Sequence, residues 1–247
     1  MRWVDGPAGP PLPAPDEVHV WRVVLPLRRA QSAECEGLLS DEEACRRLEY
    51  RSDRDRRRFA AGRGTLRRLL GRYLGVAPRE LRLAAEPGGR PRLADAAGRA
   101  RMRFNVSHSG DVVVLAFASG MEVGVDLEEL GRDVDGLQVA RQFFSPADVA
   151  ALLAVPEARR HRAFMTLWTC KEAALKAVGA GLGAALDSVR VEVRRGRGVA
   201  RIEGPGSSAA QVLRLTAFEP AAGYVAAVAV SGLSRPRARF WRAPGSP

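Results

Sequence analysis

Apolar and polar residues alternate in several short runs of the chain, and this two-residue period is typical of strands with one buried face. The first such run covers residues 18–25. Two more runs, 112–118 and 122–127, are separated by Ser119 and Gly120, so we expect them to form a hairpin in the middle of the chain. Three further strands are predicted later, at 188–195, 211–220 and 224–232.

Between these runs, apolar residues recur with the spacing of helices. Ser40 followed by Glu43 is a capping box, which predicts that a helix begins there. An arginine-rich helix is predicted over 52–75, ending at Gly75. Its apolar stripe consists of Phe59, Leu66, Leu69, Leu70 and Tyr73. Helices of the second half are predicted at 134–144, 145–155 and 160–181.

Each half of the chain therefore consists of a strand, then helices, then strands. This order is expected of an α+β fold rather than of alternating βαβ units. The sequence divides into an N-terminal half, 16–120, and a C-terminal half, 121–232. Both ends are rich in proline, glycine or arginine, which predicts a disordered tail at 1–15 and a flexible tail at 233–247.

The net charge of +11 over 247 residues indicates an anionic partner without identifying it. Nucleic acid is one alternative, although the sequence has neither zinc-finger spacing nor an aromatic RNA-binding signature. No apolar run is long enough to span a membrane and no signal peptide is evident, so we expect a cytoplasmic protein. Three scattered cysteines and three histidines argue against a disulfide framework and a zinc site.

Two carboxylates share one face of the strand predicted over "MEVGVDLEEL". Val123, Val125 and Leu127 point one way, whereas Asp126 and Glu128 point the other, about 7 Å apart at their Cα atoms. Carboxylates this close repel each other unless a cation lies between them, and a hard divalent ion is the natural occupant. The alternative is a solvated polar face of an edge hairpin.

The segment "WTCKEAALKAVG" contains both lysines of the chain, Lys171 and Lys176. In a helix, Lys171 falls within the apolar stripe, while Glu172 and Lys176 lie one turn apart on an adjacent flank. Glu172 and Lys176 could form an ordinary surface ion pair. Lys171 could extend its ammonium group outward to solvent.

The segment "FNVSHSG" places His108 between two serines just before a predicted strand, where its side chain can project from the rim of a sheet. Because the G-x-S-x-G elbow is missing, a hydrolase serine has little support. A single histidine is more often structural than functional, so this segment alone does not define a site.

The ordered set of motifs "GGRP", "FNVSHSG", "VGVDLE", "FFSPAD" and "LWTCKEAALKAVGAGL" resembles that of the 4'-phosphopantetheinyl transferases of the surfactin-synthetase-activating type, enzymes of secondary metabolite biosynthesis. The resemblance covers residues 88–187 most strongly. Each motif is weak by itself, whereas their order and spacing are highly specific.

The resemblance implies an enzyme that transfers the 4'-phosphopantetheine arm of coenzyme A to a serine of an apo acyl or peptidyl carrier protein, releasing adenosine 3',5'-bisphosphate. It implies Mg2+, with Mn2+ as an alternative, held by Asp126, Glu128 and Glu172. Glu172, directly or through a metal-bound water, would take the serine proton, and Lys176 would neutralise the departing phosphate. Lys171 would be either a second phosphate contact or a stem packed in the core.

For coenzyme A, the resemblance assigns phosphate contacts to Ser107, His108 and Arg90, the last at a position where the family often has lysine. Arg54 and Arg58 align with further phosphate-binding residues. The implied architecture is two similar α+β halves related by a pseudo-twofold axis, with the active site in the cleft between them. A chain that supplies both halves is expected to act as a monomer, with no nucleic acid or membrane as partner.

Two other functions compete with this interpretation. A basic nucleic-acid-binding protein would use its arginines and leave the carboxylates on the surface. A degenerate homologue would bind coenzyme A without turnover.

Overall fold

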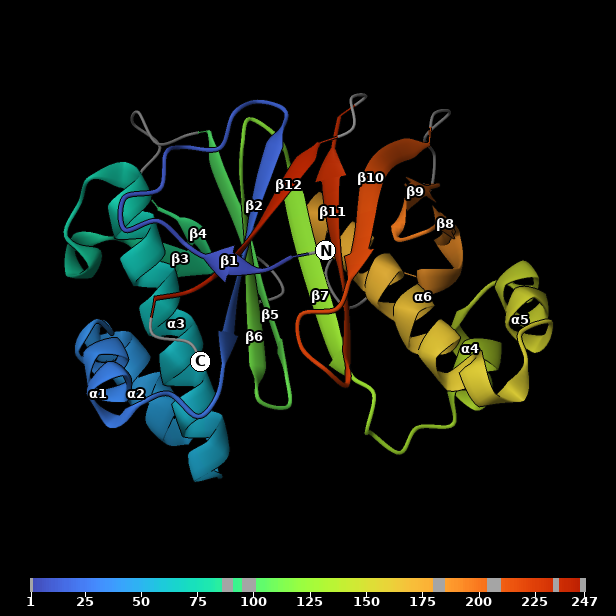
Figure 1. The fold of residues 1–247 in the computed structure, drawn as a ribbon, viewed down its shortest axis with the longest axis horizontal. Coiled ribbons are helices and arrows are strands. Elements are labelled where there is room, and N and C mark those ends of the chain that lie inside the picture. Colours follow the sequence, from blue (N-terminus) through green and yellow to red (C-terminus); the bar gives the residue numbers. More distant parts are fainter. Residues whose placement is uncertain are drawn as a thin grey trace. The chain divides into compact units, whose positions relative to one another are not determined.

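Two helices of 22 residues each, α3 (Asp53–Leu74) and α6 (Glu157–Val178), each lie against the sheet of one folded unit (Figure 1). The computed structural model describes residues 2–85, 91–94, 101–179, 185–203, 210–232 and 236–244. Unit 1 consists of Met1–Gly120 together with Ala238–Pro247, and unit 2 of Met121–Arg237. Each unit has a hydrophobic core of its own.

Unit 1 contains a strand, three helices, a short 3-10 helix and four more strands. These elements are β2 (Glu17–Val24), α1 (Arg29–Gly37), α2 (Asp41–Glu49), α3, η1 (Pro78–Glu80), β3 (Leu83–Ala85), β4 (Pro91–Leu93), β5 (Met102–Ser109) and β6 (Val112–Ser119), with β1 (Val4–Asp5) and β12 (Arg237–Arg242) added from the two ends of the chain. The main sheet has the order β1-β12-β2-β6-β5, and β3 pairs with β4. The three helices lie on one side of the main sheet (Figure 1).

The predicted helix ends of unit 1 are confirmed. The Ser40 hydroxyl accepts a hydrogen bond from the Glu43 amide at 3.3 Å, and the Glu43 carboxylate accepts one from the Ser40 amide at 3.0 Å. Helix α3 ends at Gly75, whose φ of +66° is a left-handed conformation that glycine adopts without steric cost. Most of the predicted stripe is buried in the core, namely Leu66, Leu69, Leu70 and Tyr73.

The two predicted tails are wrong where the structure describes them. β1 pairs in parallel with β12, and β12 neighbours β2 in the unit 1 sheet. Trp241 is buried, with its ring centroid 4.8 Å from that of Trp21, and Trp3 meets Phe240 edge to face at 5.2 Å. Proline, glycine and arginine suggested flexibility, but strand pairing and aromatic contacts, with Trp241 buried and Trp3 and Phe240 half-buried, hold the described parts of both segments.

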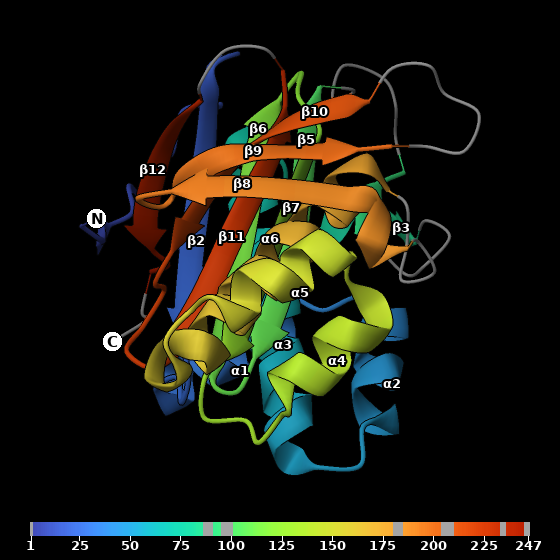
Figure 2. The same cartoon turned by 90° about the vertical axis from the view of Figure 1, so that its right-hand side faces the viewer.

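Unit 2 repeats the element order of unit 1. Its elements are β7 (Val123–Glu129), α4 (Gly136–Phe143), α5 (Pro146–Leu153), α6, η2 (Leu186–Ser188), β8 (Val189–Arg194), β9 (Arg197–Ile202), β10 (Gln211–Phe218) and β11 (Tyr224–Ser231). The strands pair antiparallel in the order β7-β11-β10-β9-β8. Figure 2 shows α6 along this sheet, with α4 and α5 beside the helix.

The hairpin predicted from 112–118 and 122–127 is also wrong. β6 lies between β2 and β5 in unit 1, whereas β7 pairs with β11 in unit 2. The turn at Ser119 and Gly120 therefore connects two units. The actual hairpin partner of β6 is β5, which the pattern did not predict because Asn105, Ser107 and Ser109 are polar although they are buried.

The observed mixture of helices and strands confirms the predicted α+β class. Both units share the order of elements, while a twofold axis relating them stays a prediction. Among the helices of the described ranges, none combines the length and the apolar character needed to cross a membrane.

Candidate functional site

Strand β7 and helix α6 of unit 2 approach each other through their backbones at Gly124. A Cβ atom on Gly124 would lie 2.1 Å from the carbonyl oxygen of Ala173 and 2.3 Å from the amide nitrogen of Ala177. No side chain tolerates such distances, so this approach requires glycine. The α6 residues at this point, Ala173 and Ala177, have small side chains, so the strand can approach the helix backbone closely. The residues that follow Gly124 on the same face of β7 are therefore held against α6.

Asp126 is the next residue on this face, and its carboxylate contacts Lys176 of α6. Oδ1 accepts a hydrogen bond from Nζ at 2.6 Å, and Asp126 is only 5 % exposed. This burial contradicts the alternative of a solvated polar face. The ion pair of Lys176 therefore connects α6 to β7, whereas the predicted surface pair with Glu172 would lie within α6 alone.

Glu128 lies farther along the same face and is half-buried. Its Oε2 accepts a hydrogen bond from Nη1 of Arg132 at 3.0 Å. Since Arg132 is exposed and only four residues away, this ion pair contributes little to stability. The Glu128 carboxylate can exchange Arg132 for another cation at small cost.

Glu172 lies on α6 one turn before Lys176 and is half-buried. Burial raises the pKa of its carboxyl above the ordinary value; Lys176 opposes this, while the negative charges of Asp126 and Glu128 raise the pKa further. The three carboxylates predicted as metal ligands therefore influence one another electrostatically. A carboxylate with a raised pKa is also a stronger base than an exposed one.

The three carboxylates offer the hard oxygen donors that Mg2+ prefers, and their mutual repulsion is the kind that a divalent cation relieves. Within the described part of the chain, however, no group of three or more His, Cys, Asp or Glu side chains is arranged to hold a metal ion as it stands. Lys176 and Arg132 supply the positive charge beside Asp126 and Glu128. The assignment of the three residues as Mg2+ ligands stays a prediction.

In unit 1, two of the residues predicted to bind coenzyme A line a common pocket of about 170 Å³. Its cationic and aromatic lining consists of Arg46, Arg58, Arg63, His108, Tyr50 and Phe59. The Tyr50 and Phe59 ring centroids lie 5.4 Å apart. Guanidinium groups bind phosphate oxygens through charge-assisted hydrogen bonds, and aromatic rings suit a planar base. The pocket therefore has the chemistry of a nucleotide site.

Arg58 is held at this pocket by two neighbours. It donates a hydrogen bond to the carbonyl of Gly110 at 3.3 Å and forms an ion pair with Asp55, one helical turn earlier. A hydrogen bond from Ser52 lowers the pKa of the Asp55 carboxyl, and the positive charges of Arg58 and His108 contribute as well. Arg58 thus has an ionised partner with which a bound phosphate would compete.

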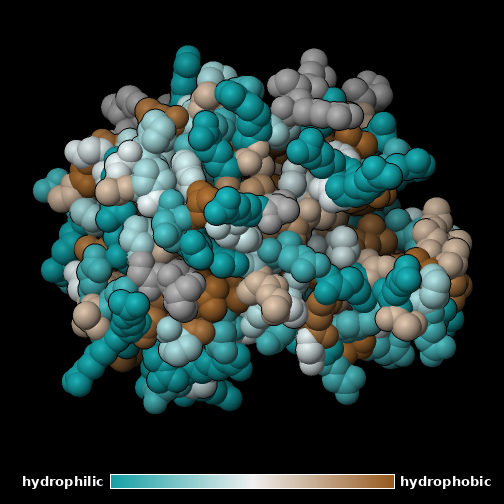
Figure 3. Space-filling model, in the orientation of Figure 1, coloured by the Kyte–Doolittle hydropathy of each residue, from teal (hydrophilic) through white to brown (hydrophobic). Residues whose placement is uncertain are grey.

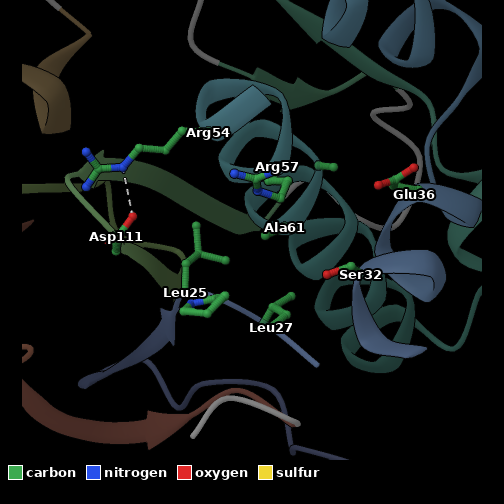
Figure 4. A pocket seen from close by; sticks show the side chains of 10 residues that line it. Leu25, Leu27, Ser32, Glu36, Arg54, Arg57, Ala61 and Asp111 are labelled. Carbon is green, nitrogen blue, oxygen red and sulfur yellow. Dashed lines mark hydrogen bonds and ion pairs between the residues drawn. The ribbon is translucent and has the colours of Figure 1, made fainter. Parts of the chain in front are cut away.

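Arg54 lines a different pocket of unit 1, of about 290 Å³, although it lies only one turn from Arg58. Figure 4 shows its guanidinium directed at Asp111, to which Nε donates a hydrogen bond at 3.0 Å. The rest of this pocket is largely apolar, with Leu25, Leu27 and Ala61 in its wall. The structure therefore does not bring Arg54 and Arg58 into one pocket.

Ser107 and His108 are neighbours in β5, so their side chains point to opposite faces of the sheet. His108 is exposed and lines the pocket with Arg58, whereas Ser107 is buried and does not line it. Arg90, the remaining residue predicted to contact phosphate, lies outside the described residues.

Sequence reasoning did not single out Arg46 and Arg63, because in a chain with 39 lysines and arginines no spacing distinguishes them from the others.

Of the alternatives for Lys171, the structure agrees with packing in the core and not with a solvent-directed ammonium group, since the side chain is fully buried. Unit 2 thus presents a buried aspartate paired with a half-buried lysine, and unit 1 a pocket lined by arginines, and both have charges suited to phosphate-bearing ligands.

Comparison with known proteins assigns both units to one family. Residues 122–229 match the 4'-phosphopantetheinyl transferase superfamily, and residues 28–120 match the N-terminal part of a 4'-phosphopantetheinyl transferase. The chain is 35% identical over 226 residues to the 4'-phosphopantetheinyl transferase HetI of Nostoc sp., covering 92% of each chain. It is 30% identical over 205 residues to the transferase Sfp of Bacillus subtilis, covering 82% of this chain and 87% of Sfp.

Among solved structures, the holo-[acyl-carrier-protein] synthase of Thermotoga maritima matches 46% of this chain and 64% of its own, with 19% identity and a TM-score of 0.37, too low to support a conclusion. The sequence matches are sufficient. The chain belongs to the 4'-phosphopantetheinyl transferase family, and it is an enzyme that transfers 4'-phosphopantetheine to carrier proteins. A nucleic-acid-binding protein is thereby disfavoured.

Proposed function

We propose that this enzyme catalyses the attack of a carrier-protein serine on coenzyme A, in an Mg2+-dependent reaction that releases adenosine 3',5'-bisphosphate. The observation that carries the proposal is the contact between the buried Asp126 of β7 and the half-buried Lys176 of α6, beside the carboxylate of Glu172, whose pKa is raised. Acidic metal donors and a mobile cation are what the transfer of a phosphoryl-linked group requires.

Glu172 accepts the proton of the incoming serine hydroxyl. Serine is a poor nucleophile when protonated, and the raised pKa of Glu172 brings its basicity closer to neutral pH. As the proton moves to Glu172, the serine oxygen forms a bond to the phosphorus atom that carries the pantetheine arm. The bond from this phosphorus to the bridging pyrophosphate oxygen breaks, and adenosine 3',5'-bisphosphate leaves with the electron pair.

Lys176 stabilises the negative charge that develops on the leaving phosphate. A lysine ammonium group is a compact charge on a flexible stem, so it can follow a phosphate that moves during the reaction. Asp126 holds this ammonium group in place before the substrate binds. When bound to Asp126, Glu128 and Glu172, Mg2+, or Mn2+ in its place, would polarise the pyrophosphate oxygens as a Lewis acid.

The carrier protein docks on α4 and α5 of unit 2. Phe143 and Leu153, the last residues of these two helices, are 45 % and 47 % exposed, whereas Phe144 is buried against Phe164. On the face seen in Figure 3, apolar side chains are scattered among hydrophilic ones. The net charge of +11 suits carriers that are acidic, as those of this family are expected to be. A cytoplasmic, monomeric enzyme is part of the same proposal.

The direct test combines the enzyme, coenzyme A, Mg2+ and a panel of apo acyl and peptidyl carrier proteins. Intact-mass spectrometry should show one added phosphopantetheine arm, and chromatography should show adenosine 3',5'-bisphosphate in equal amount. EDTA should stop the reaction, and added Mg2+ or Mn2+ should restore it. If no carrier gains mass, the proposal fails; an undiminished rate in EDTA would remove only its metal requirement.

Replacing Arg58 with alanine is expected to raise the KM for coenzyme A by about tenfold or more, because a charge-assisted hydrogen bond to phosphate is lost. If the contact is to the 3'-phosphate, the same substitution should leave the KM for 3'-dephospho-coenzyme A nearly unchanged. Steady-state kinetics with both substrates measures this. Arg57→Ala is the matched control, since Arg57 lies on the same helix, is exposed and lines the other pocket of unit 1 rather than this one.

A further inference from the structure

Lys171 is fully buried in unit 2, one residue before Glu172. Its ammonium group has three oxygen acceptors: the Asp148 carboxylate at 2.9 Å, the Leu186 carbonyl at 2.8 Å and the Val189 carbonyl. The group also lies 4.9 Å from the centre of the Phe144 ring. An ammonium group has three N–H donors, so every donor has a partner.

Arg67 of unit 1 has an equivalent environment. It is buried and donates hydrogen bonds to the Glu43 carboxylate at 2.5 Å, to the Pro78 carbonyl at 2.9 Å and to the Leu81 carbonyl at 3.0 Å. In both units the acceptors are therefore one carboxylate and two main-chain carbonyls.

The elements that supply these acceptors correspond as well. Arg67 and Lys171 are each the fifteenth residue of a 22-residue helix. Glu43 and Asp148 are each the third residue of the preceding helix and close its capping box. The carbonyls come from the first residue of the following 3-10 helix and from the residue just after it, in η1 and in η2 alike. The two units thus contain the same buried cation arrangement, once with arginine and once with lysine.

Each arrangement fixes the helix that presents a substrate-binding surface. In unit 1, Glu43 also pairs with Arg63 at 3.6 Å, and α2 carries Arg46; both arginines line the pocket assigned to coenzyme A. In unit 2, Oδ2 of Asp148 also accepts a hydrogen bond from Ser145 Oγ at 2.6 Å, at the start of α5. Lys171 thereby ties the α4–α5 segment to the helix that carries Glu172.

We propose that these two buried cations are positioning residues for different substrates: Arg67 for coenzyme A, through the pocket of unit 1, and Lys171 for the carrier protein, through α4 and α5. Neither touches a substrate. The inference rests on the proposed function, which assigns the pocket and the docking segment. It explains the presence of a fully buried lysine next to Glu172 without giving that lysine a role in the chemistry.

The test is a crossed comparison of two double variants, Lys171→Met with Asp148→Asn and Arg67→Met with Glu43→Gln. Removing both charges of the Lys171 pair avoids leaving one buried charge unpaired, which is the more damaging change. In unit 1, Glu43→Gln also removes the carboxylate partner of Arg63, which itself lines the pocket. The Lys171 pair should raise the KM for the carrier by about tenfold and leave the KM for coenzyme A within about twofold, because only the docking segment is released. The Arg67 pair should show the reverse.

A purely structural role would lower the thermal stability of both variants and would change neither KM, or both KM values together; either outcome would overturn the proposal. If a double variant fails to fold, the charge-retaining single substitutions Asp148→Glu and Glu43→Asp, which leave no buried cation without an anionic partner, should give the same split at smaller size. If the wild-type enzyme transfers the arm normally but the two double variants do not differ in which KM they change, only this inference is refuted. A wild-type enzyme without transfer refutes the proposed function.

Discussion

The Glu172→Gln variant is expected to bind coenzyme A normally and to transfer its arm about 10²- to 10⁴-fold more slowly, the usual loss when a positioned general base is removed. Glutamine keeps the size of the side chain and one carbonyl oxygen, but it cannot accept the serine proton. Single-turnover mass spectrometry of the carrier measures the chemical step, and isothermal titration measures coenzyme A binding. A variant with the full rate would show that the base is another group.

The same variant should be more stable than the wild type in metal-free buffer at pH 8. Burial and the neighbouring carboxylates raise the folded-state pKa of Glu172 above its unfolded value of about 4.3. Above the folded pKa the ionised side chain therefore reduces stability, and below the unfolded pKa this effect disappears. The difference in Tm between variant and wild type should shrink as the pH falls toward about 4. Glu157→Gln, at the exposed start of α6, should show neither effect.

Gly124→Ala is expected to be the most damaging small substitution at the site. The added methyl group would lie 2.1 Å from the Ala173 carbonyl oxygen in the α6 backbone, so the strand and the helix must separate. Overpacking of this kind costs about 3 kcal/mol or more when the neighbour is backbone and cannot rotate away. Separation of β7 from α6 also moves Asp126 away from Lys176, and transfer activity should fall together with stability.

Urea unfolding and the carrier assay test this pair of effects. Gly131→Ala is the matched control in unit 2, because its added methyl group would meet no described atom within 4 Å and the backbone there is not left-handed. The control should unfold within about 0.5 kcal/mol of the wild type, as surface substitutions usually do. A Gly124→Ala protein as stable and as active as this control would show that β7 and α6 do not make the close contact described.

Five of the six α-helices and six of the twelve strands in the described residues could be predicted from local patterns; helix α1 was not predicted. Ser40 and Glu43 mark a helix start through hydrogen bonds between near neighbours, and Gly75 marks a helix end through its own backbone freedom. Strand β5 could not be predicted this way, because its buried polar residues break the alternation. The pairing of β12 with β2 was also not predicted, since it joins residues more than 200 positions apart in the sequence.

The candidate site was predictable in part. The motifs identified the family and named Asp126, Glu128, Glu172 and Lys176. In the structure, Asp126 contacts Lys176, and the negative charge of Glu128 contributes to the raised pKa of Glu172. The phosphate contacts were less predictable. Arginines are numerous in this chain, and only the fold shows that Arg58 lines a pocket with His108 while Arg54 lines another.

The sequence by itself determined the family and the reaction, because each motif is a local arrangement of side chains whose order is specific, and it named the acidic and basic residues that we propose at the centre of the site. Only the tertiary structure decided which charges are buried and with which partner. Lys171 and Lys176 are chemically identical and five residues apart, yet one is enclosed by Asp148 and two carbonyls and the other reaches Asp126. That difference depends on packing between elements remote in the chain, which no local pattern records.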